Sequence, residues 1–365
     1  MRIAQVAPLY ESVPPRRYGG TERIVSYLTE ELVRLGHDVT LFATADSVTA
    51  AKLRPFADRA LRLDSGCIDP LAPHVRMLSA VYRSAADFDV IHCHTDYLGL
   101  ALAERADVPT LITLHGRLDI AELAPLYAEH PHTPLVSISD AQRRPMLRAT
   151  WIATVYHGLP QTLFTFHPHP DDYLLFLGRI SPEKGVDRAI RVAQRAGVRL
   201  RIAAKVDRVD AEYFERDIKP MLDAPGIEFV GEVADRDKQK LLGGARALLF
   251  PINWPEPFGL VVIEALACGT PIIAHPRGSV SELLAHGETG LIAESEDDMV
   301  EAVRHVGDID RRRCRREFEQ RFTDRIMAQG YATLYRKLAS SRLERSRSSS
   351  QPQATLQDEQ NPVES

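Results

Sequence analysis

Short apolar runs alternate with amphipathic helical segments along almost the entire chain. The run at 2–8 is mainly apolar and ends at a proline, which is typical of a strand buried on both faces of a parallel sheet. The segment at 21–36 carries its apolar residues at helical spacing and ends at Gly36. Strands and helices that alternate in this way predict an α/β fold with parallel sheets covered by helices.

The alternation forms two series, and a proline-containing segment at 166–172 without a hydrophobic period separates them. Further strands of the first series are predicted at 37–44, 89–94, 109–116, 135–139 and 153–158. The second series begins with the strand and turn at 173–185 and continues with helices at 186–197, 235–245, 260–269 and 279–287 and strands at 199–206, 227–232, 246–251, 271–276 and 289–295. A chain of 365 residues is long for one core, so we expect two doubly wound domains, at 1–165 and 166–322.

The C-terminal part of the chain differs from the two series. A last helix is predicted at 323–340, and we expect it to pack back on the first domain. The segment at 341–365 lacks aromatic residues and is rich in Ser and Gln, so a disordered tail is expected there.

Composition narrows the class of protein. The net charge of −5 gives no reason to expect nucleic acid as a partner. The four cysteines are far apart and show no metal-ligand spacing, which predicts reduced thiols and a cytoplasmic location. Neither a signal peptide nor a membrane-spanning run is recognisable, and oligomeric state cannot be read from the sequence.

Ligands of open α/β sheets bind beyond the carboxyl ends of the strands, at helix N-termini. Gly19 and Gly20 stand directly before the first helix, where a backbone without side chains can approach an anion closely. Arg179 and Lys184 flank a turn between a strand and a helix, and two cations there suit a diphosphate. Taken singly, the first motif also fits a flexible turn and the second a solvated basic turn.

The stretch EPFGLVVIE at 256–264 places two carboxylates around an apolar run. Prolines on both sides hold Glu256 in an extended loop. A helix is then predicted to begin at Gly259, Leu260 and Val261. Their backbone N–H groups have no helical partner, and the helix dipole favours an anion there by about 0.3–2 kcal/mol. Glu264 follows about one turn later and could form a surface salt bridge, but its apolar neighbours favour a buried position with a ligand.

Histidines follow two strands of the first series. His115 precedes a glycine at the end of a strand, so we expect it to face a cleft between the domains, although a single histidine is more often structural. A metal site is one interpretation of the cluster His92, Cys93, His94 and Asp96, but no second cluster completes a set of three or four ligands, and we reject that interpretation.

Three motifs occur in order: paired glycines before the first helix, GRxxxxKG at the start of the second series, and EPFGLVVIE late in that series. Their order and spacing resemble the retaining glycosyltransferases of family 4, over roughly residues 1–340. The resemblance implies the GT-B architecture, in which two Rossmann-like domains face a cleft, and a reaction on nucleotide sugars. The loop ESVPPRRYGGTE is similar to a bacterial branch of the family.

The resemblance also implies roles around the diphosphate and the sugar of the donor. Arg179 and Lys184 would stabilise the departing diphosphate, and Gly20 with Gly19 would approach it from the first domain. His115 would face the sugar and the reacting centre.

The remaining roles fall on the second domain. Glu256 would hold hydroxyls of the donor sugar, with help from the backbone N–H groups of Phe258 and Gly259. Glu264 would bind the ribose. Val230, Gly231 and Glu232 would contact the base, mostly through the backbone.

The resemblance implies no metal and no separate cofactor, since the nucleotide sugar is a co-substrate, and no Asp-x-Asp motif stands in a suitable context. A uridine diphosphate sugar is the expected donor, and the acceptor stays open: a sugar, a lipid-linked sugar or a small molecule. Arg143, Arg144 and Arg148 near Trp151 fit a weak membrane contact, although a solvated helix face explains them more simply. Two other functions compete: a sugar-nucleotide binding protein without catalysis, and a Rossmann-type oxidoreductase, which would need a G-x-G-x-x-G motif after the first strand.

Overall fold

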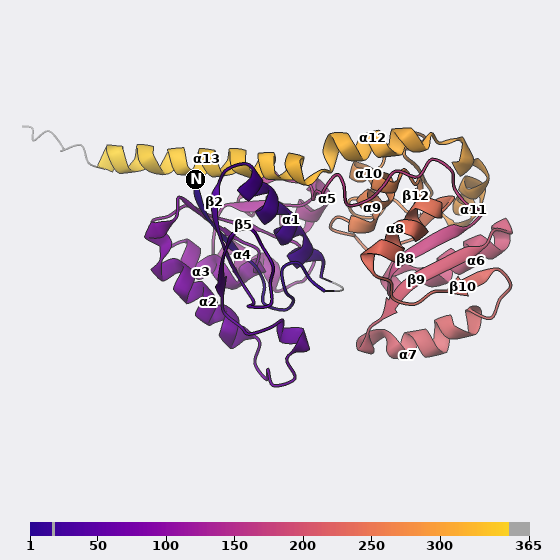
Figure 1. Cartoon of the computed structure of the whole chain (residues 1–365), viewed down its shortest axis with the longest axis horizontal. Helices are drawn as coiled ribbons and strands as arrows, with labels where there is room; N and C mark the ends of the chain where they lie inside the picture. Colours follow the sequence, from indigo (N-terminus) through magenta and orange to yellow (C-terminus); the bar gives the residue numbers. More distant parts are fainter. Residues whose placement is uncertain (17–18, 350–365) are drawn as a thin grey trace, which may run out of the picture.

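The computed structural model describes residues 1–16 and 19–349, and these form two α/β lobes side by side (Figure 1). The first lobe is built on a seven-stranded sheet with the order β3-β2-β1-β4-β5-β6-β7, in which every neighbouring pair is parallel. Its strands are β1 (Arg2–Val6), β2 (Asp38–Ala43), β3 (Lys52–Pro55), β4 (Val90–Cys93), β5 (Thr110–Thr113), β6 (Leu135–Ser137) and β7 (Trp151–Thr154). The register pairs Ile3 of β1 with Val39 of β2 on one side and with Val90 of β4 on the other.

The second lobe has a six-stranded parallel sheet with the order β10-β9-β8-β11-β12-β13. Its strands are β8 (Leu174–Ile180), β9 (Leu200–Val206), β10 (Ile227–Phe229), β11 (Ala247–Phe250), β12 (Ile272–Ala274) and β13 (Gly290–Ile292). Both sheets place their first strand in the interior and add strands outward on each side, which is the doubly wound arrangement. The predicted fold class is confirmed.

Helices lie in most of the connections between consecutive strands of each sheet, as is usual for parallel pairing, whereas β2 and β3 are joined by a loop. In the first lobe they are α1 (Gly20–Arg34), α2 (Leu71–Arg83), α3 (Leu100–Ala103), α4 (Leu123–Ala128) and α5 (Asp140–Arg143). In the second lobe they are α6 (Val186–Ala196), α7 (Ala211–Tyr213), α8 (Asp235–Gly244), α9 (Leu260–Cys268), α10 (Val280–Leu283), α11 (Glu296–His305) and α12 (Arg311–Arg321). The strands are buried because helices cover them, and β4, β5 and β11 are buried at every position.

One strand was not predicted. β3 lies at the edge of the first sheet and has the sequence KLRP, whose residues are exposed except for the partly buried Leu53. An edge strand needs no continuous apolar run, and charged residues there discourage pairing with another chain. The periodicity that identifies buried strands therefore gives no signal for β3.

The chain passes between the lobes twice, and the two passages run next to each other. Leu159 donates its backbone N–H to the carbonyl of Phe322 at 2.9 Å and accepts from the N–H of Asp324 at 2.9 Å. A Cβ on Gly158 would lie 2.2 Å from the carbonyl oxygen of Thr323, so this close approach needs a glycine. After the second passage the chain belongs to the first lobe again.

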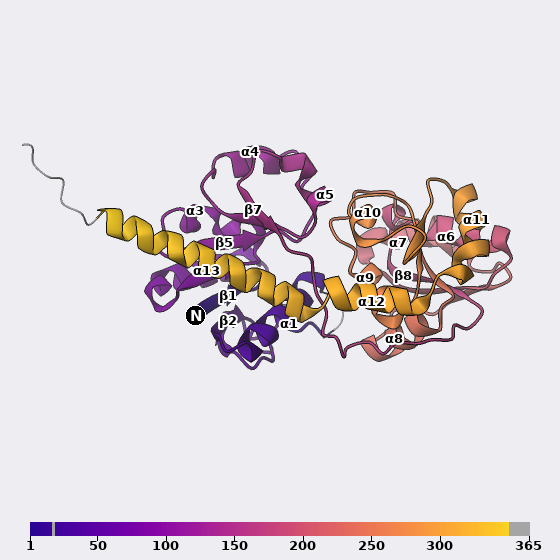
Figure 2. The ribbon, with the colours of Figure 1, turned by 90° about the horizontal axis from the view of Figure 1, so that it is seen from above.

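That return is made by α13 (Asp324–Ser349), which packs against α1 and β4 and extends over the first lobe (Figure 2). Tyr331 and Tyr335 are its largest fully buried side chains. The helix reaches Ser349, so the expected end at 340 and the expected disorder from 341 are wrong for 341–349. The reason is that 331–349 contain neither glycine nor proline, so nothing in the sequence terminates the helix. The rest of the expected tail, 350–365, lies outside the described residues.

Candidate active site

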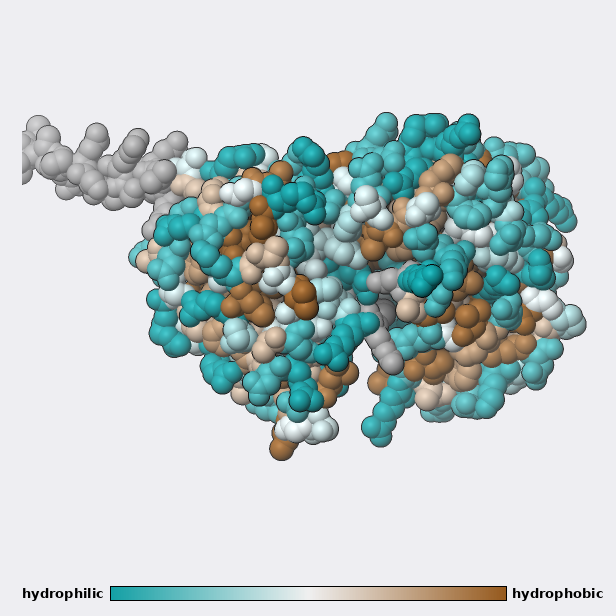
Figure 3. Space-filling view, viewed as in Figure 1, coloured by the Kyte–Doolittle hydropathy of each residue, from teal (hydrophilic) through white to brown (hydrophobic). Residues whose placement is uncertain are grey.

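A cleft of about 1000 Å³ separates the two lobes and is lined by residues of both. The space-filling view shows the hollow between the lobes (Figure 3). Most of the loops that line it follow the carboxyl ends of strands, namely β1, β4 and β5 in the first lobe and β8, β10 and β11 in the second, and the carboxyl-end residues of β9 line it directly. This is the edge of a parallel sheet at which ligands bind.

The N-termini of α1 and α9 face each other across this cleft. A Cβ on Gly20, the first residue of α1, would lie 3.5 Å from Cδ1 of Leu260, the first residue of α9. Gly19 caps α1 without a side chain, and Gly259 caps α9 with a φ of 84°, a left-handed conformation that favours glycine. The two helices are 15 and 9 residues long. Each directs the free N–H groups of its first turn and its positive dipole end toward the same space.

Glu256 is positioned by contacts on three sides. Its carboxylate accepts a charge-assisted hydrogen bond from Nζ of Lys184 and a hydrogen bond from Nε1 of Trp254 at 2.9 Å. Ser279 donates its N–H to the carbonyl of Glu256 at 3.0 Å. Gly278, with a φ of 59°, passes so close that a Cβ there would lie 2.2 Å from that carbonyl oxygen. The extended loop predicted from the prolines is therefore braced by a second loop.

Arg179 lies at the end of β8 among three carboxylates. It contacts Glu183, and its guanidinium nitrogens are 3.8 Å from Asp207 and 3.5 Å from Asp210. Burial acts to raise the pKa of Glu183, but hydrogen bonds from its own backbone, from Ser181 and from Arg179 hold that pKa below its usual range. The two predicted cations thus both line the cleft, and each has an acidic partner.

Glu264 is 5% exposed and lies inside α9, at the cleft. Nζ of Lys238 in α8 donates to its carboxylate at 2.6 Å. The surface salt bridge considered from the sequence is therefore a buried ion pair, and Lys238 is a cleft residue that no sequence motif marks. Lysine in a helix of mixed charge has no distinguishing signal, because its partner lies 26 residues further along the chain.

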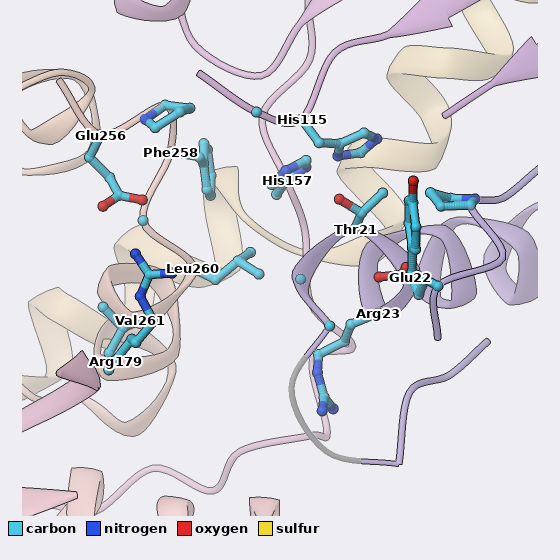
Figure 4. Close-up of a pocket in the computed structure, with 18 of the residues that line it drawn as sticks. Thr21, Glu22, Arg23, His115, His157, Arg179, Glu256, Phe258, Leu260 and Val261 are labelled. Carbon is cyan, nitrogen blue, oxygen red and sulfur yellow. The ribbon is translucent and has the colours of Figure 1, made fainter. Parts of the chain in front are cut away.

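Three residues after β10 were expected to contact the base of the nucleotide. Of Val230, Gly231 and Glu232, only Glu232 lines the cleft, and the lining continues with Val233 and Ala234. β10 ends at Phe229, and the next two residues still bond to β9: Val230 donates its N–H to the carbonyl of Ile202 at 2.8 Å, and the carbonyl of Gly231 accepts from Ala204 at 2.9 Å. Phe258 and Val261, like Leu260, line the cleft as predicted (Figure 4).

His115 lies in the first lobe at the cleft and contacts other histidines. Its Nε2 is 2.9 Å from Nδ1 of His94, and its ring stacks on that of His157 with centroids 5.2 Å apart. The ring of His157 in turn meets Phe258 edge-on at 4.8 Å. Burial lowers the pKa of His115 to about 3 and the pKa values of His94 and His157 well below the usual value, so these rings are neutral near pH 7.

The first-lobe wall also carries polar residues to which no motif assigns a role in donor binding. Tyr10, Asp96 and Tyr97 line the cleft, and Asp96 has a φ of 50°, the only positive value among the non-glycine residues that the structure describes. Burial raises the pKa of Asp96 to about 6, against the lowering effect of a hydrogen bond from the backbone of His115. Backbone conformations of this kind cluster at functional sites.

Two further expectations concern other parts of the chain. Within the described ranges, no group of three or more His, Cys, Asp or Glu is placed to hold a metal ion, and no helix has the length and apolar composition needed to cross a bilayer. Arg143 is held inward by Oγ of Ser137 at 2.6 Å and by the ring of Trp151, whereas Arg144 and Arg148 are exposed. The weak membrane contact stays a prediction.

Comparison with known proteins matches this geometry. Residues 18–157 match the family model Glycosyltransferase Family 4, and residues 164–321 match Glycosyl transferases group 1. Glycogen synthase of Mycobacterium tuberculosis is 28% identical, over 84% of this chain and 86% of the relative. Phosphatidyl-myo-inositol mannosyltransferase of Mycolicibacterium smegmatis is 25% identical over 89% of each chain.

Solved structures have the same fold. AviGT4, a glycosyltransferase involved in avilamycin A biosynthesis, is 25% identical with a TM-score of 0.70 and covers 93% of this chain and 98% of its own. Anabaena HepE in complex with UDP-glucose is 17% identical with a TM-score of 0.70, over 92% of this chain and 100% of its own. The two lobes, the cleft motifs and the two consecutive family matches together identify the chain as a glycosyltransferase of family 4 with the GT-B architecture.

Proposed function

We propose that the protein transfers a hexosyl group from a nucleotide-diphosphate sugar, with retention of configuration, to a hydroxyl group of an acceptor. One observation carries the proposal: the N-terminus of α9, the cations Arg179 and Lys184, and the acids Glu256 and Glu264 all line a single cleft. An elongated ligand with a diphosphate at its middle matches that order of charges.

The diphosphate would lie at the start of α9. Free N–H groups there, with Arg179 and Lys184 beside them, would stabilise the negative charge that grows as the sugar–phosphate bond breaks. Fixed cations and a helix dipole can supply this stabilisation, so we propose that the reaction needs no metal. Glu264 and Lys238 would bind the ribose end, and Glu232 to Ala234 the base.

The sugar would lie between Glu256 and His115. The Glu256 carboxylate would accept hydrogen bonds from sugar hydroxyls, and neutral His115 would face the reacting carbon. In a retaining reaction of this kind the acceptor approaches from the face that the nucleotide leaves. Its hydroxyl proton would pass to the departing diphosphate, so no side chain need form a covalent bond to the sugar.

The acceptor would enter from the first lobe, beside Tyr10, Asp96 and Tyr97. Aromatic rings with one carboxyl group suit a polyhydroxyl compound, because the rings cover its apolar faces and the carboxyl binds its hydroxyls. The complex of HepE with UDP-glucose supports a uridine diphosphate sugar as donor. The separated free cysteines support the expected cytoplasmic location.

A thermal-shift screen of nucleoside diphosphates and their sugars tests the proposal, because a ligand that binds only the folded state raises the melting temperature. We expect UDP and one or more UDP-sugars to raise it, because binding at a hundredfold excess over Kd adds about 2.7 kcal/mol to the free energy of unfolding. Glu264→Gln should lose about half of that stabilisation or more, since we expect its Kd to rise about tenfold or more. A screen in which no nucleotide shifts the wild-type protein would contradict the proposed donor.

A further inference from the structure

A continuous chain of hydrogen bonds crosses the interior of the first lobe, from α13 to the cleft. Tyr335 of α13 contacts Gln5 of β1 at 3.0 Å, and Gln5 contacts Nε2 of His94 at 2.8 Å. His94 contacts His115 at 2.9 Å. Tyr335, Gln5 and His94 are at most 1% exposed, so water cannot replace any of these partners.

The direction of each hydrogen bond follows from Gln5. Its Nε2 donates to the hydroxyl of Tyr335, so its Oε1 must accept from Nε2–H of His94. A neutral imidazole has one N–H only, so Nδ1 of His94 is an acceptor. Nε2 of His115 must therefore carry the proton that it shares with His94.

A side branch supports the same direction. Having accepted from Gln5, the Tyr335 hydroxyl donates to Nδ1 of His92 at 2.7 Å. Nε2–H of His92 then donates to Oγ1 of Thr113 at 2.7 Å, and Thr113 meets the hydroxyl of Tyr331 at 2.9 Å. Every polar atom of the branch thus has a partner that agrees with the assignment at Gln5.

The chain ends at an atom without a partner. Nδ1 of His115 is buried and makes no hydrogen bond with the described residues, although His115 lines the cleft. With the proton on Nε2, this nitrogen presents a lone pair. A buried acceptor without a partner is unfavourable, and a ligand hydroxyl that donates to it removes that cost.

We propose that Tyr335, acting through Gln5 and His94, is a positioning residue that holds His115 in its Nε2–H tautomer, so that Nδ1 accepts a hydrogen bond from a hydroxyl of the sugar. The identity of the ligand rests on the proposed function, whereas the tautomer does not. Burial lowers the pKa values of His94 and His115, which agrees with neutral imidazole rings in this series of hydrogen bonds.

Helix α13 would thereby contribute a positioning residue to the active site. This helix follows both lobes in sequence and returns to the first, where Tyr335 lies 330 residues from Gln5. The hydrogen-bond network on the first-lobe side of the cleft is therefore complete only when α13 packs on this lobe and supplies Tyr335.

The test compares Tyr335→Phe with two control variants, all in the full chain. Tyr331→Phe removes a hydroxyl of the same helix and similar burial that does not touch Gln5. Tyr82→Phe removes a hydroxyl of the first lobe that contacts Cys93 and lies outside the network. If Tyr335→Phe does not fold, Gln5→Met interrupts the network at its next member.

The readout is the tautomer of His115 in protein labelled with 15N-histidine, observed without substrate by two-bond 1H–15N correlations and assigned by its loss in His115→Gln. We expect the Nε2–H form in wild type and both controls, and a mixture of forms in Tyr335→Phe. An Nδ1–H form in wild type, or an unchanged tautomer in both Tyr335→Phe and Gln5→Met, would overturn the proposal.

Kinetics separate this inference from the proposed function. In Tyr335→Phe, kcat/KM should fall about tenfold, the loss expected for one hydrogen bond, while Kd for the nucleoside diphosphate stays as in wild type. If the protein shows the predicted tautomers but transfers no sugar, that result contradicts the proposed function and leaves the proposed network in place. An unchanged kcat/KM in an active Tyr335→Phe variant would contradict the role of Nδ1.

Discussion

The ammonium group of Lys184 contacts the carboxylate of Glu256, although the two residues are 72 positions apart in the chain. Both are residues that the sequence assigned to opposite parts of one donor, the diphosphate and the sugar. They neutralise each other, and Trp254 donates to the same carboxylate oxygen. A donor that binds to both residues must therefore exchange this ion pair for its own contacts.

Replacing Lys184 by alanine should lower kcat by about 10²–10³-fold, because a fixed cation at the leaving group is lost. The measurement is steady-state release of nucleoside diphosphate. Lys240→Ala is the matched control, since Lys240 is exposed and its ion pair is with the nearby Asp237 on the same helix. Equal rates for Lys184→Ala and wild type would remove Lys184 from the proposed mechanism.

The two acids should have separable effects. Glu256→Gln should abolish transfer and leave the Kd of the free nucleoside diphosphate nearly unchanged, because Glu256 is assigned to the sugar. Glu264→Gln should weaken nucleotide binding about tenfold or more, since hydrogen bonds to charged groups contribute about 1.5–3 kcal/mol. Calorimetry with UDP measures both, and the reverse pattern would show that the roles are exchanged.

Gly278 should be needed for the position of Glu256. Gly278→Ala would place a Cβ 2.2 Å from the carbonyl oxygen of Glu256, in addition to left-handed strain of about 1–3 kcal/mol. Gly287→Ala is the control, because Gly287 also has a positive φ but nothing within 4 Å of a Cβ. We expect only Gly278→Ala to lose activity at a temperature at which both variants remain folded. Equal losses would show that strain alone is responsible.

The buried histidines should make stability depend on pH. Burial lowers the pKa of His157, so below about pH 6.5 the unfolded chain binds a proton that the folded protein does not, and stability falls with falling pH. Raised carboxyl pKa values, as at Glu22 and Asp96, act in the opposite direction. His157→Phe removes one histidine and leaves these carboxyls in place.

Urea unfolding between pH 7.5 and 5 measures this effect. Below pH 6.5 the unfolding free energy of His157→Phe should depend less steeply on pH than that of wild type, by up to about 1.4 kcal/mol per pH unit. Identical slopes would mean that His157 takes up its proton in the folded protein.

Much of the fold could be predicted, because its strands are buried and its helices amphipathic. The strand at 2–8, the helix at 21–36 and the junction at 256–264 all occur as β1, α1 and the start of α9. Edge strand β3 and the full length of α13 could not be predicted, since an edge strand has no apolar run and nothing in the sequence ends the helix at 340.

The site could be predicted where a motif fixes local geometry. Gly19, Arg179, Lys184, Glu256 and Glu264 all line the cleft. The partners of these residues, among them Lys238, Trp254, His94 and Tyr335, follow from tertiary contacts. A lysine on α8 or a tyrosine on α13 has the same local sequence signal whether it faces the site or solvent.

Release of nucleoside diphosphate from a panel of nucleotide sugars, with and without candidate acceptor sugars, tests the central claim most directly. We predict release from at least one UDP-sugar by wild type, undiminished by EDTA, with loss in Glu256→Gln and a product of retained anomeric configuration. Tight binding of nucleotides without release from any sugar donor would contradict catalysis and indicate a sugar-nucleotide binding protein.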